Sequence, residues 1–196
     1  IRSIGSINYI EKTKEGELKG YNTDGEGYAK GLKKLLERKG QDLRGKKIVM
    51  LGAGGTANAV AFALAQRGAK IVIANRTVAY AQELAKAVND YFSLQGDDAV
   101  FAVGENFIAD EVKDADVIVN VSSKGEAGKM EGYSALAKAE GDVETNLREA
   151  NQILDTIPRH CIITDVLLST KDSPLISSAK EKGFETQNGL PMVIYQ

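Results

Sequence analysis

The chain has 196 residues, of which 43% are hydrophobic and 27% are charged, and its formal net charge is −2. This composition is typical of a globular protein, its balanced charges leave no basic field for nucleic acid, and no apolar run approaches the roughly 20 residues that cross a bilayer. One cysteine and one histidine offer too few ligands for a metal site. With a single cysteine, the chain fits a cytoplasmic protein. We expect it to bind a small molecule and no nucleic acid, membrane or metal, and the composition does not indicate its oligomeric state.

The first predicted elements are two short strands. Residues 4–13 and 17–21 have extended-looking sequences, and residues 14–16 between them suit a tight turn, so we predict a β-hairpin. Because an isolated hairpin is only marginally stable, the sheet partners of these strands are expected outside the chain. Since the chain opens on Ile1 and stops at Gln196, just after a helix start, we expect it to be a piece of a longer protein.

A helix is predicted from about residue 24 to residue 38, because leucines recur at helical spacing on one face and Gly40 follows. The residues before it, Asn22, Thr23 and Asp24, are all types that cap helix N-termini. On spacing alone, Asp24 is interpreted as such a cap.

From residue 46 onward, strand-like and helix-like patterns alternate. Strands are predicted at 47–51, 70–74, 99–103, 116–121, 161–165 and 184–186. Helices are predicted at about 55–67 and 78–92, with a weak one near 108–113. Because strands joined by helices require right-handed crossovers, we predict a doubly wound parallel α/β sheet of the Rossmann type.

A long polar stretch, residues 125–159, separates the fourth and fifth of these strands. Glycines in its first half predict a mobile loop, whereas apolar residues at helical spacing predict an amphipathic helix in its second half. Cys161 follows within an apolar run, which favours a buried strand residue over a nucleophile.

The first strand of the alternating region ends in a glycine-rich turn. The spacing Gly52-x-Gly54-x-x-Ala57, between a strand and an alanine-rich helix, is the dinucleotide fingerprint in its alanine-ended form. Gly52 allows the tight turn, Gly54 lets a pyrophosphate approach the backbone, and Ala57 keeps the helix near the strand. The free N–H groups and the positive end of the helix then face the phosphates. The predicted nucleotide-binding residues of this turn are Gly52, Ala53, Gly54, Gly55, Thr56 and Ala57.

The end of the second strand indicates which nucleotide is bound. In proteins that hold NAD, an acidic residue about 20 positions after the first glycine accepts hydrogen bonds from the ribose hydroxyls. The chain has Asn75, Arg76 and Thr77 there, and no carboxylate. A guanidinium at this place can stack on adenine and pair with a 2′-phosphate, while its neighbours donate hydrogen bonds. These residues favour NADP over NAD, the alternative being that Arg76 is a solvated charge at a strand end.

Later strand ends are expected to complete the crevice, because ligands of doubly wound sheets bind outside the carboxyl ends of the strands. The segments at these ends are residues 120–124, with Asn120, Val121 and Ser122, and residues 165–168. We therefore expect both segments to lie near the nucleotide.

Several segments, taken together, resemble motifs of the shikimate dehydrogenase family. Residues 20–27, Gly-Tyr-Asn-Thr-Asp-Gly-Glu-Gly, resemble its Asn-Thr-Asp segment, and residues 6–9, Ser-Ile-Asn-Tyr, look like its substrate-binding asparagine segment. Segments that look like its later motifs follow in order at 52–55, 75–77, 120–123 and 189–196. The resemblance covers nearly the whole chain.

By resemblance, the chain holds the end of one α/β domain followed by an NADP-binding Rossmann domain. Residues 1–23 would end the substrate domain, residues 24–45 would form a connecting helix, and residues 46–196 would form the NADP-binding domain. The implied activity is that of an NADP-dependent oxidoreductase that interconverts 3-dehydroshikimate and shikimate by hydride transfer.

The resemblance also implies roles for single residues. Asp24 would be the aspartate of a catalytic Lys–Asp pair whose lysine belongs to a segment before Ile1, so the fragment alone is expected to be inactive. Asn8 and Gln196 would contact the substrate. The remaining cofactor-binding residues would be Val166 and Gly189, at the nicotinamide end, and Met192.

The chain also departs from the family pattern. Leu168 stands where a tyrosine usually touches the substrate, and Tyr80 stands where many members carry a second arginine. Lys124 and Glu126 replace a small residue and a methionine near the nicotinamide, and the stretch 125–159 is longer than expected. Two alternatives therefore stay open: a dehydrogenase of quinate or another polyol acid, and a nucleotide-binding module without catalysis.

Overall fold

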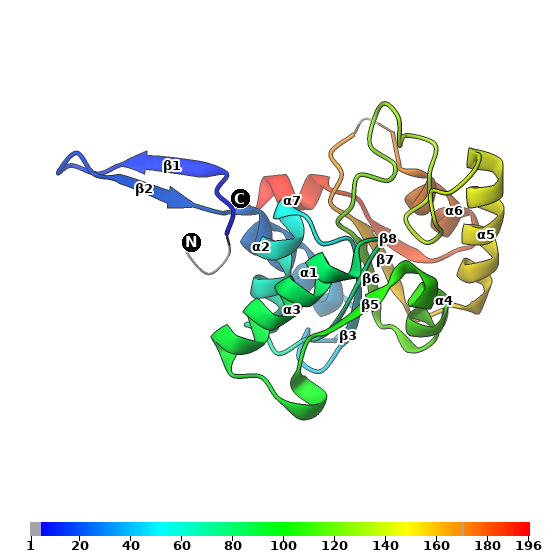
Figure 1. Cartoon of the computed structure of the whole chain (residues 1–196), viewed down its shortest axis with the longest axis horizontal. Coiled ribbons are helices and arrows are strands. Elements are labelled where there is room, and N and C mark those ends of the chain that lie inside the picture. Colours follow the sequence, from blue (N-terminus) through cyan, green and yellow to red (C-terminus); the bar gives the residue numbers. More distant parts are fainter. Residues whose placement is uncertain (1–4, 170) are drawn as a thin grey trace.

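A six-stranded parallel sheet forms the centre of the computed structural model, which describes residues 5–169 and 171–196 (Figure 1). The strands in chain order are β3 (Lys47–Leu51), β4 (Lys70–Asn75), β5 (Phe101–Gly104), β6 (Val117–Asn120), β7 (Ile162–Asp165) and β8 (Glu185–Gln187). Their order across the sheet is β5-β4-β3-β6-β7-β8, and all neighbours are parallel. This order confirms the predicted doubly wound fold and puts its switch point between β3 and β6.

Helices cover both faces of the sheet. One face carries α1 (Asp24–Glu37), α2 (Gly55–Ala65), α3 (Val78–Phe92) and α7 (Leu190–Ile194), and the other carries α4 (Ile108–Glu111), α5 (Val143–Thr156) and α6 (Pro174–Glu181). Short 3₁₀ turns lie at η1 (Gly96–Asp98), η2 (Glu105–Phe107) and η3 (Val112–Asp114). Within the described ranges, no helix has the length and apolar character needed to cross a membrane.

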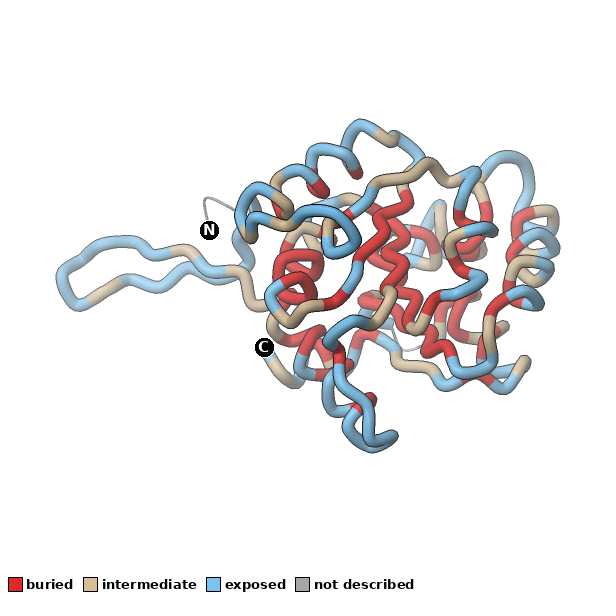
Figure 2. Tube along the Cα trace, turned by 90° about the horizontal axis from the view of Figure 1, so that it is seen from below, coloured by how far each residue is buried: buried red, intermediate tan, exposed pale blue. Residues whose placement is uncertain are grey.

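Alternate residues of the central strand β3 point into two separate cores. Ile48 and Met50 pack with α1, α2 and α3, whereas Val49 and Leu51 pack with α4, α5 and α6. All four side chains are buried, as expected for a parallel strand covered on both faces. Figure 2 shows the buried residues concentrated in the middle of the molecule.

The predicted hairpin is present and stands apart from the sheet. Strands β1 (Tyr9–Lys12) and β2 (Leu18–Tyr21) pair antiparallel, with Tyr9 opposite Tyr21. They project to the left in Figure 1 and, in the part of the chain that the structure describes, pair only with each other. Ile4, where the first predicted strand begins, lies outside the described residues.

Glycines on α1 bring three helices close together. A Cβ atom at Gly25 would lie 2.1 Å from the carbonyl oxygen of Ala59 in α2, and one at Gly27 would lie 2.3 Å from that of Met192 in α7. Only glycine fits at these crossings, so the start of α1 is held beside both α2 and α7. The predicted connecting helix therefore packs into the same core as the sheet.

A buried hydrogen bond ties α1 to the sheet itself. The hydroxyl oxygen of Tyr28 lies 2.8 Å from Thr164 Oγ1 in β7. Because Thr164 donates its own proton to the carbonyl of Ile118, Tyr28 is the donor in this pair. Burial raises the pKa of Tyr28, which keeps the phenol in the donating form.

The structure differs from the expected mobile loop in the first half of the stretch 125–159. Residues 134–137 are buried, and Asn146 of α5 fastens them. Asn146 Oδ1 accepts the N–H of Ser134 at 2.7 Å, and its Nδ2 donates to the carbonyl of Lys138 at 2.9 Å. A buried asparagine satisfied by backbone groups organises this loop, which glycine content alone could not reveal.

One helix was not expected from the sequence, and two local expectations are corrected or confirmed. Helix α6 was not predicted, although Ser173 as N-cap followed by Pro174 in the first turn is a helix-start signal. The weak helix expected near 108–113 is reduced to α4 between two 3₁₀ turns. Cys161 is buried just before β7, and burial raises the pKa of its thiol to about 12, which confirms the buried-residue interpretation.

Candidate active site

The glycine-rich turn after β3 has the backbone geometry that its spacing predicts. Gly52 has a φ of +125°, and a Cβ atom there would lie 2.9 Å from the backbone nitrogen of Ser122. Gly54 is the N-cap of α2 and has no capping side chain, and a Cβ atom there would meet nothing within 4 Å. The start of α2 is therefore open at Gly54, as the close approach of a phosphate requires.

A pocket of about 460 Å³ opens at this turn. The described residues that line it come from four strand ends, the first turn of α3 and one loop: Ala53, Gly54, Asn75, Arg76, Thr77, Tyr80, Glu105, Ser122, Ser123, Lys124, Met130, Ala139 and Glu140. A second pocket, of about 490 Å³, shares Ala53, Gly54 and Tyr80 with it and continues between α2 and α3. Of the residues that the sequence assigned to a nucleotide, just under half line these two pockets: Ala53, Gly54, Gly55, Asn75, Arg76, Thr77 and Ser122.

The end of β4 presents a cationic side chain to this pocket. Asn75 Nδ2 donates to the carbonyl of Thr77 at 2.9 Å, which turns the chain into α3. Arg76 between them is exposed and, among the described residues, forms no ion pair or side-chain hydrogen bond. Its guanidinium is therefore free to pair with an anionic ligand.

Some residues assigned to the cofactor shape the walls without lining the pocket. Asn120 is fully buried: its Oδ1 accepts from the nitrogen and hydroxyl of Ser122 at 3.0 and 2.7 Å. Its Nδ2 donates to the carbonyl of Lys124 at 2.9 Å and to Asp165 Oδ2 at 3.1 Å. Both ends of the amide are thus used inside the protein, so Asn120 fixes the loop after β6. The other buried members of this group are Gly52, Ala57, Val121, Val166, Gly189 and Met192.

Asp165, at the end of β7, is a buried carboxylate that the sequence did not single out. Its Oδ2 also accepts the hydroxyl of Ser173 at 2.6 Å, and its Oδ1 accepts the N–H of Leu167 at 2.8 Å. Burial raises the pKa of Asp165, while these hydrogen bonds act in the opposite direction. The carboxylate joins the ends of β6 and β7 to the start of α6.

Gly189 and Val166 are in close contact after the end of β7. A Cβ atom at Gly189 would lie 2.5 Å from the carbonyl oxygen of Val166 and 2.4 Å from that of Leu167. The backbone after β7 therefore passes directly against the start of α7. The two residues that the sequence assigned to the nicotinamide end are therefore neighbours.

Asp24 is the centre of a polar cluster drawn from both ends of the chain. Asp24 Oδ1 accepts hydrogen bonds from Asn8 Nδ2 and from Gln196 Nε2, each at 2.7 Å. The expectation that Asp24 caps α1 is wrong, because Thr23 is the N-cap residue and Asn22 Oδ1 accepts the N–H of Asp24 at 3.0 Å. The carboxylate thus points to Asn8 and Gln196.

Ser6 joins this cluster to the glycine-rich turn. Its hydroxyl donates to the carbonyl of Gly55 at 3.1 Å and accepts from Asn22 Nδ2 at 2.8 Å. The segment that carries Asn8 and the start of α1 therefore lies beside the first turn of α2. The polar cluster and the nucleotide pocket are parts of one region.

Comparisons with known proteins agree with this geometry. The family model described as Shikimate / quinate 5-dehydrogenase matches residues 34–126. A protein named shikimate dehydrogenase (NADP(+)) from Alkaliphilus metalliredigens is 35% identical over 196 residues, which cover 100% of this chain and 61% of that protein. The chain spans about 60% of the length of the curated relatives that it matches.

Solved structures give the same result. A crystal structure of a shikimate dehydrogenase in complex with NADP+ matches with a TM-score of 0.78 at 30% identity. The match covers 99% of this chain and 59% of that chain. A quinate dehydrogenase from Corynebacterium glutamicum in complex with NAD has a TM-score of 0.74 at 26% identity, with 99% of this chain and 60% of that chain covered. In its sequence matches and its fold, the chain is similar to members of the shikimate dehydrogenase family.

Proposed function

We propose that the chain is the nucleotide-binding part of an NADP-dependent oxidoreductase that interconverts 3-dehydroshikimate and shikimate. In this proposal residues 46–196 bind the nucleotide, residues 24–45 connect two domains, and residues 1–23 end the substrate domain. The observation that carries it is the link through Ser6, which holds the Asp24 cluster beside the first turn of α2. A catalytic carboxylate that lies beside a dinucleotide-binding turn is suited to hydride transfer between a bound cofactor and a polar substrate.

The residues of the glycine-rich turn fit a dinucleotide. We propose that the pyrophosphate lies against the backbone of Gly54, where no Cβ atom obstructs it, and accepts hydrogen bonds from the first-turn N–H groups of α2. Arg76 would pair with the 2′-phosphate, since it has no other anionic partner among the described residues. When bound, NADP would supply or accept the hydride.

Asp24 would serve the proton side of the reaction. Reduction of a ring ketone needs a proton at the developing alkoxide, which a positioned ionisable pair delivers. Both side-chain hydrogen bonds to the Asp24 carboxylate end on Oδ1, and none of the described residues donates to Oδ2, which would accept from a lysine or the substrate. We propose that Asn8 and Gln196 orient this carboxylate and contact the hydroxyl groups of the substrate.

One observation favours a second substrate. Leu168 is 64% exposed after β7, where the family usually has a tyrosine against the substrate. An apolar residue cannot donate a hydrogen bond to a substrate group, so a relative of shikimate such as quinate is the alternative substrate. Steady-state assays of the full-length protein with both compounds separate the two.

The experiment that tests the proposal uses the 196-residue chain. Calorimetric titration with NADP should show binding, and addition of shikimate should give no NADP reduction, because Asp24 has no lysine partner among the described residues. Failure to bind NADP would contradict the nucleotide site. NADP reduction by the chain alone would contradict the assignment of Asp24 as one half of a catalytic pair.

A further inference from the structure

A buried ion pair lies in the wall of the nucleotide pocket. Lys124 Nζ donates to Glu105 Oε1 at 2.6 Å, and the two side chains are 10% and 11% exposed. The same amine donates to the carbonyl of Ala137 at 2.7 Å. Lys124 thus connects the loop after β6 with the end of β5 and with the loop before α5.

The loop before α5 supplies part of the same pocket. Met130, Ala139 and Glu140 line the 460 Å³ pocket together with Arg76. We call residues 130–140 the wall segment. The carbonyl of Ala137 sits inside this segment and also accepts a hydrogen bond from Asn146 Nδ2 at 3.2 Å, so the segment is attached to α5 on one side and to Lys124 on the other.

The chemistry of the contact favours a positional role. A buried lysine is costly to desolvate, and a single carboxylate partner offsets that cost only in good geometry, so such pairs contribute little to stability compared with apolar residues of similar volume. What an ammonium group offers, and methionine cannot, is a directed bond to a carbonyl oxygen. Lys124 makes this bond to Ala137, the residue from which the wall segment continues to Ala139 and Glu140.

We propose that Lys124, paired with Glu105, is a positioning residue for nucleotide binding. Its ammonium group holds the wall segment against the pocket, so that the adenosine half of the nucleotide enters a preformed cavity. A preformed site binds its ligand more tightly because no conformational entropy is lost in ordering its wall when the ligand binds. This inference rests on the proposed function, since it takes the pocket at Arg76 as the adenosine site.

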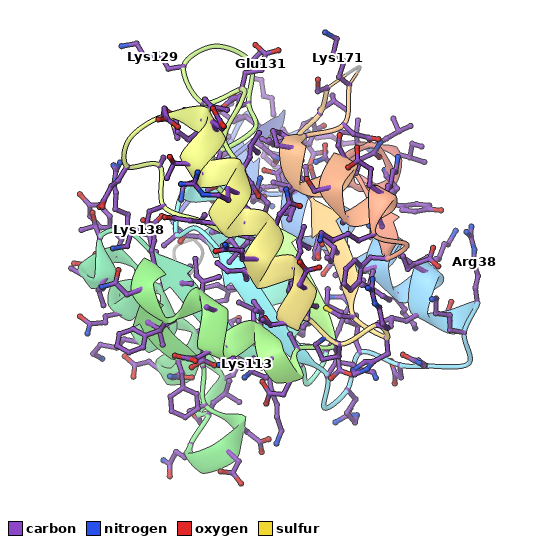
Figure 3. All side chains as sticks on the ribbon, turned by 90° about the vertical axis from the view of Figure 1, so that its right-hand side faces the viewer. Arg38, Lys113, Lys129, Glu131, Lys138 and Lys171 are labelled. Atoms are coloured by element: carbon purple, nitrogen blue, oxygen red, sulfur yellow. The ribbon has the colours of Figure 1, made fainter. Side chains whose placement is uncertain are left out.

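The test compares Lys124→Met with Lys129→Met. Lys129 is an exposed lysine close to the wall segment, and Figure 3 shows its side chain projecting away from the molecule. Adenosine 2′,5′-bisphosphate, which carries only the adenosine half of NADP, and NADP itself are titrated into each chain by calorimetry. Lys124→Met should weaken both ligands by the same factor, about fivefold, and Lys129→Met should change neither by more than about twofold.

A double variant separates the effect of Lys124 on the position of the wall segment from its effect on the stability of the fold. In Glu105→Met/Lys124→Met both charges are replaced by apolar side chains, so the thermal midpoint should return toward that of the unaltered chain. Its affinity for adenosine 2′,5′-bisphosphate should stay about fivefold reduced, because the bond to Ala137 is still missing. Affinity that recovers together with stability, or a Lys124→Met chain with unaltered affinity, would overturn the inference.

The variant Arg76→Ala distinguishes a wrong role for Lys124 from a wrong assignment of the nucleotide site. If the unaltered chain binds adenosine 2′,5′-bisphosphate and Arg76→Ala weakens it, the pocket is the adenosine site, and the Lys124 variants alone decide the inference. If the unaltered chain does not bind the ligand, or Arg76→Ala leaves binding intact, the proposed nucleotide site is wrong and the role of Lys124 falls with it.

Discussion

Gln196 Nε2 donates a hydrogen bond of 2.7 Å to Asp24 Oδ1 across a sequence separation of 172 residues. The contact follows from helix packing, because Gly27 lets α1 approach α7 closely: a Cβ atom there would lie 2.9 Å from Gln196 Cγ. Asn8 reaches the same carboxylate oxygen from the segment before β1. The proposed catalytic residue is thus fixed by contacts from both ends of the chain.

Asp24→Asn should abolish most activity of the full-length protein without altering its fold. The amide keeps an oxygen for Asn8 and Gln196 but cannot take part in proton transfer, so kcat should fall by about 10²- to 10⁴-fold with little change in KM. Steady-state kinetics check this, with Asp97→Asn, an exposed aspartate in η1, as the matched control. A kcat within a few-fold of the unaltered protein would show that Asp24 is not in the proton path.

Arg76→Ala should weaken NADP binding and leave NAD binding almost unchanged. A charge-assisted hydrogen bond contributes about 1.5–3 kcal/mol, and about 1.4 kcal/mol is tenfold in affinity. Because Arg76 is exposed, we expect the low end, about a tenfold loss, which grows as salt is lowered. Titration with both nucleotides measures it, and Arg38→Ala, whose side chain projects from another part of the surface in Figure 3, is the control. Equal weakening of NAD and NADP would assign Arg76 to adenine stacking or folding.

Gly54→Ala should fold normally and bind NADP poorly. Gly54 has a φ of −90°, and a Cβ atom there meets nothing within 4 Å, so alanine costs the folded chain no strain. The same Cβ atom would occupy the close approach of the pyrophosphate, and affinity should drop about tenfold or more. Thermal unfolding and NADP titration of the same variant check both halves. Undiminished NADP affinity in a folded variant would place the pyrophosphate elsewhere.

We expect Asp165 to lower the free energy of unfolding as the pH rises, and we expect Asp165→Asn to remove this pH dependence. Burial raises the pKa of this carboxyl above 3.8, its usual value, so its protonated form is favoured in the folded state. The stability it contributes is then complete below the unfolded pKa and is lost as the pH rises through the folded pKa. Urea unfolding between about pH 4 and pH 7 should therefore show the unaltered chain losing stability relative to Asp165→Asn.

Asp142 provides a control of opposite sign for that experiment. It caps α5, and the N–H of Thr145 lowers its pKa, so its contribution is present at higher pH and is lost as the pH falls. Urea unfolding extended down to about pH 2 should show the unaltered chain gaining stability relative to Asp142→Asn as the pH rises to about 5. If both aspartates gave the same sign, the burial of Asp165 would not govern its titration.

The sequence predicts the sheet because local patterns determine it. The bounds of β3 and α3 are observed as predicted, since apolar periodicity and flanking polar or glycine residues mark them. The glycine-rich turn and Arg76 also meet in one pocket as expected, because parallel strands end at one edge of the sheet.

Contacts between distant loops could not be predicted in the same way. Lys124 is conspicuous in the sequence, but its partner Glu105 belongs to another strand end, and nothing local pairs them. Asp165 and Ser173 likewise meet only because β7 and α6 are adjacent. Asp24 was interpreted as a cap because residue type and position allow that role, whereas the neighbouring side chains that redirect it lie far away in sequence.

The most direct test of the account measures kcat/KM of the full-length protein with NADP, for shikimate and for quinate, by the absorbance of the reduced nucleotide. The proposed function predicts turnover of both or of shikimate alone, with the higher kcat/KM for shikimate. A higher kcat/KM for quinate, or no turnover of either compound by a protein that binds NADP, would contradict it.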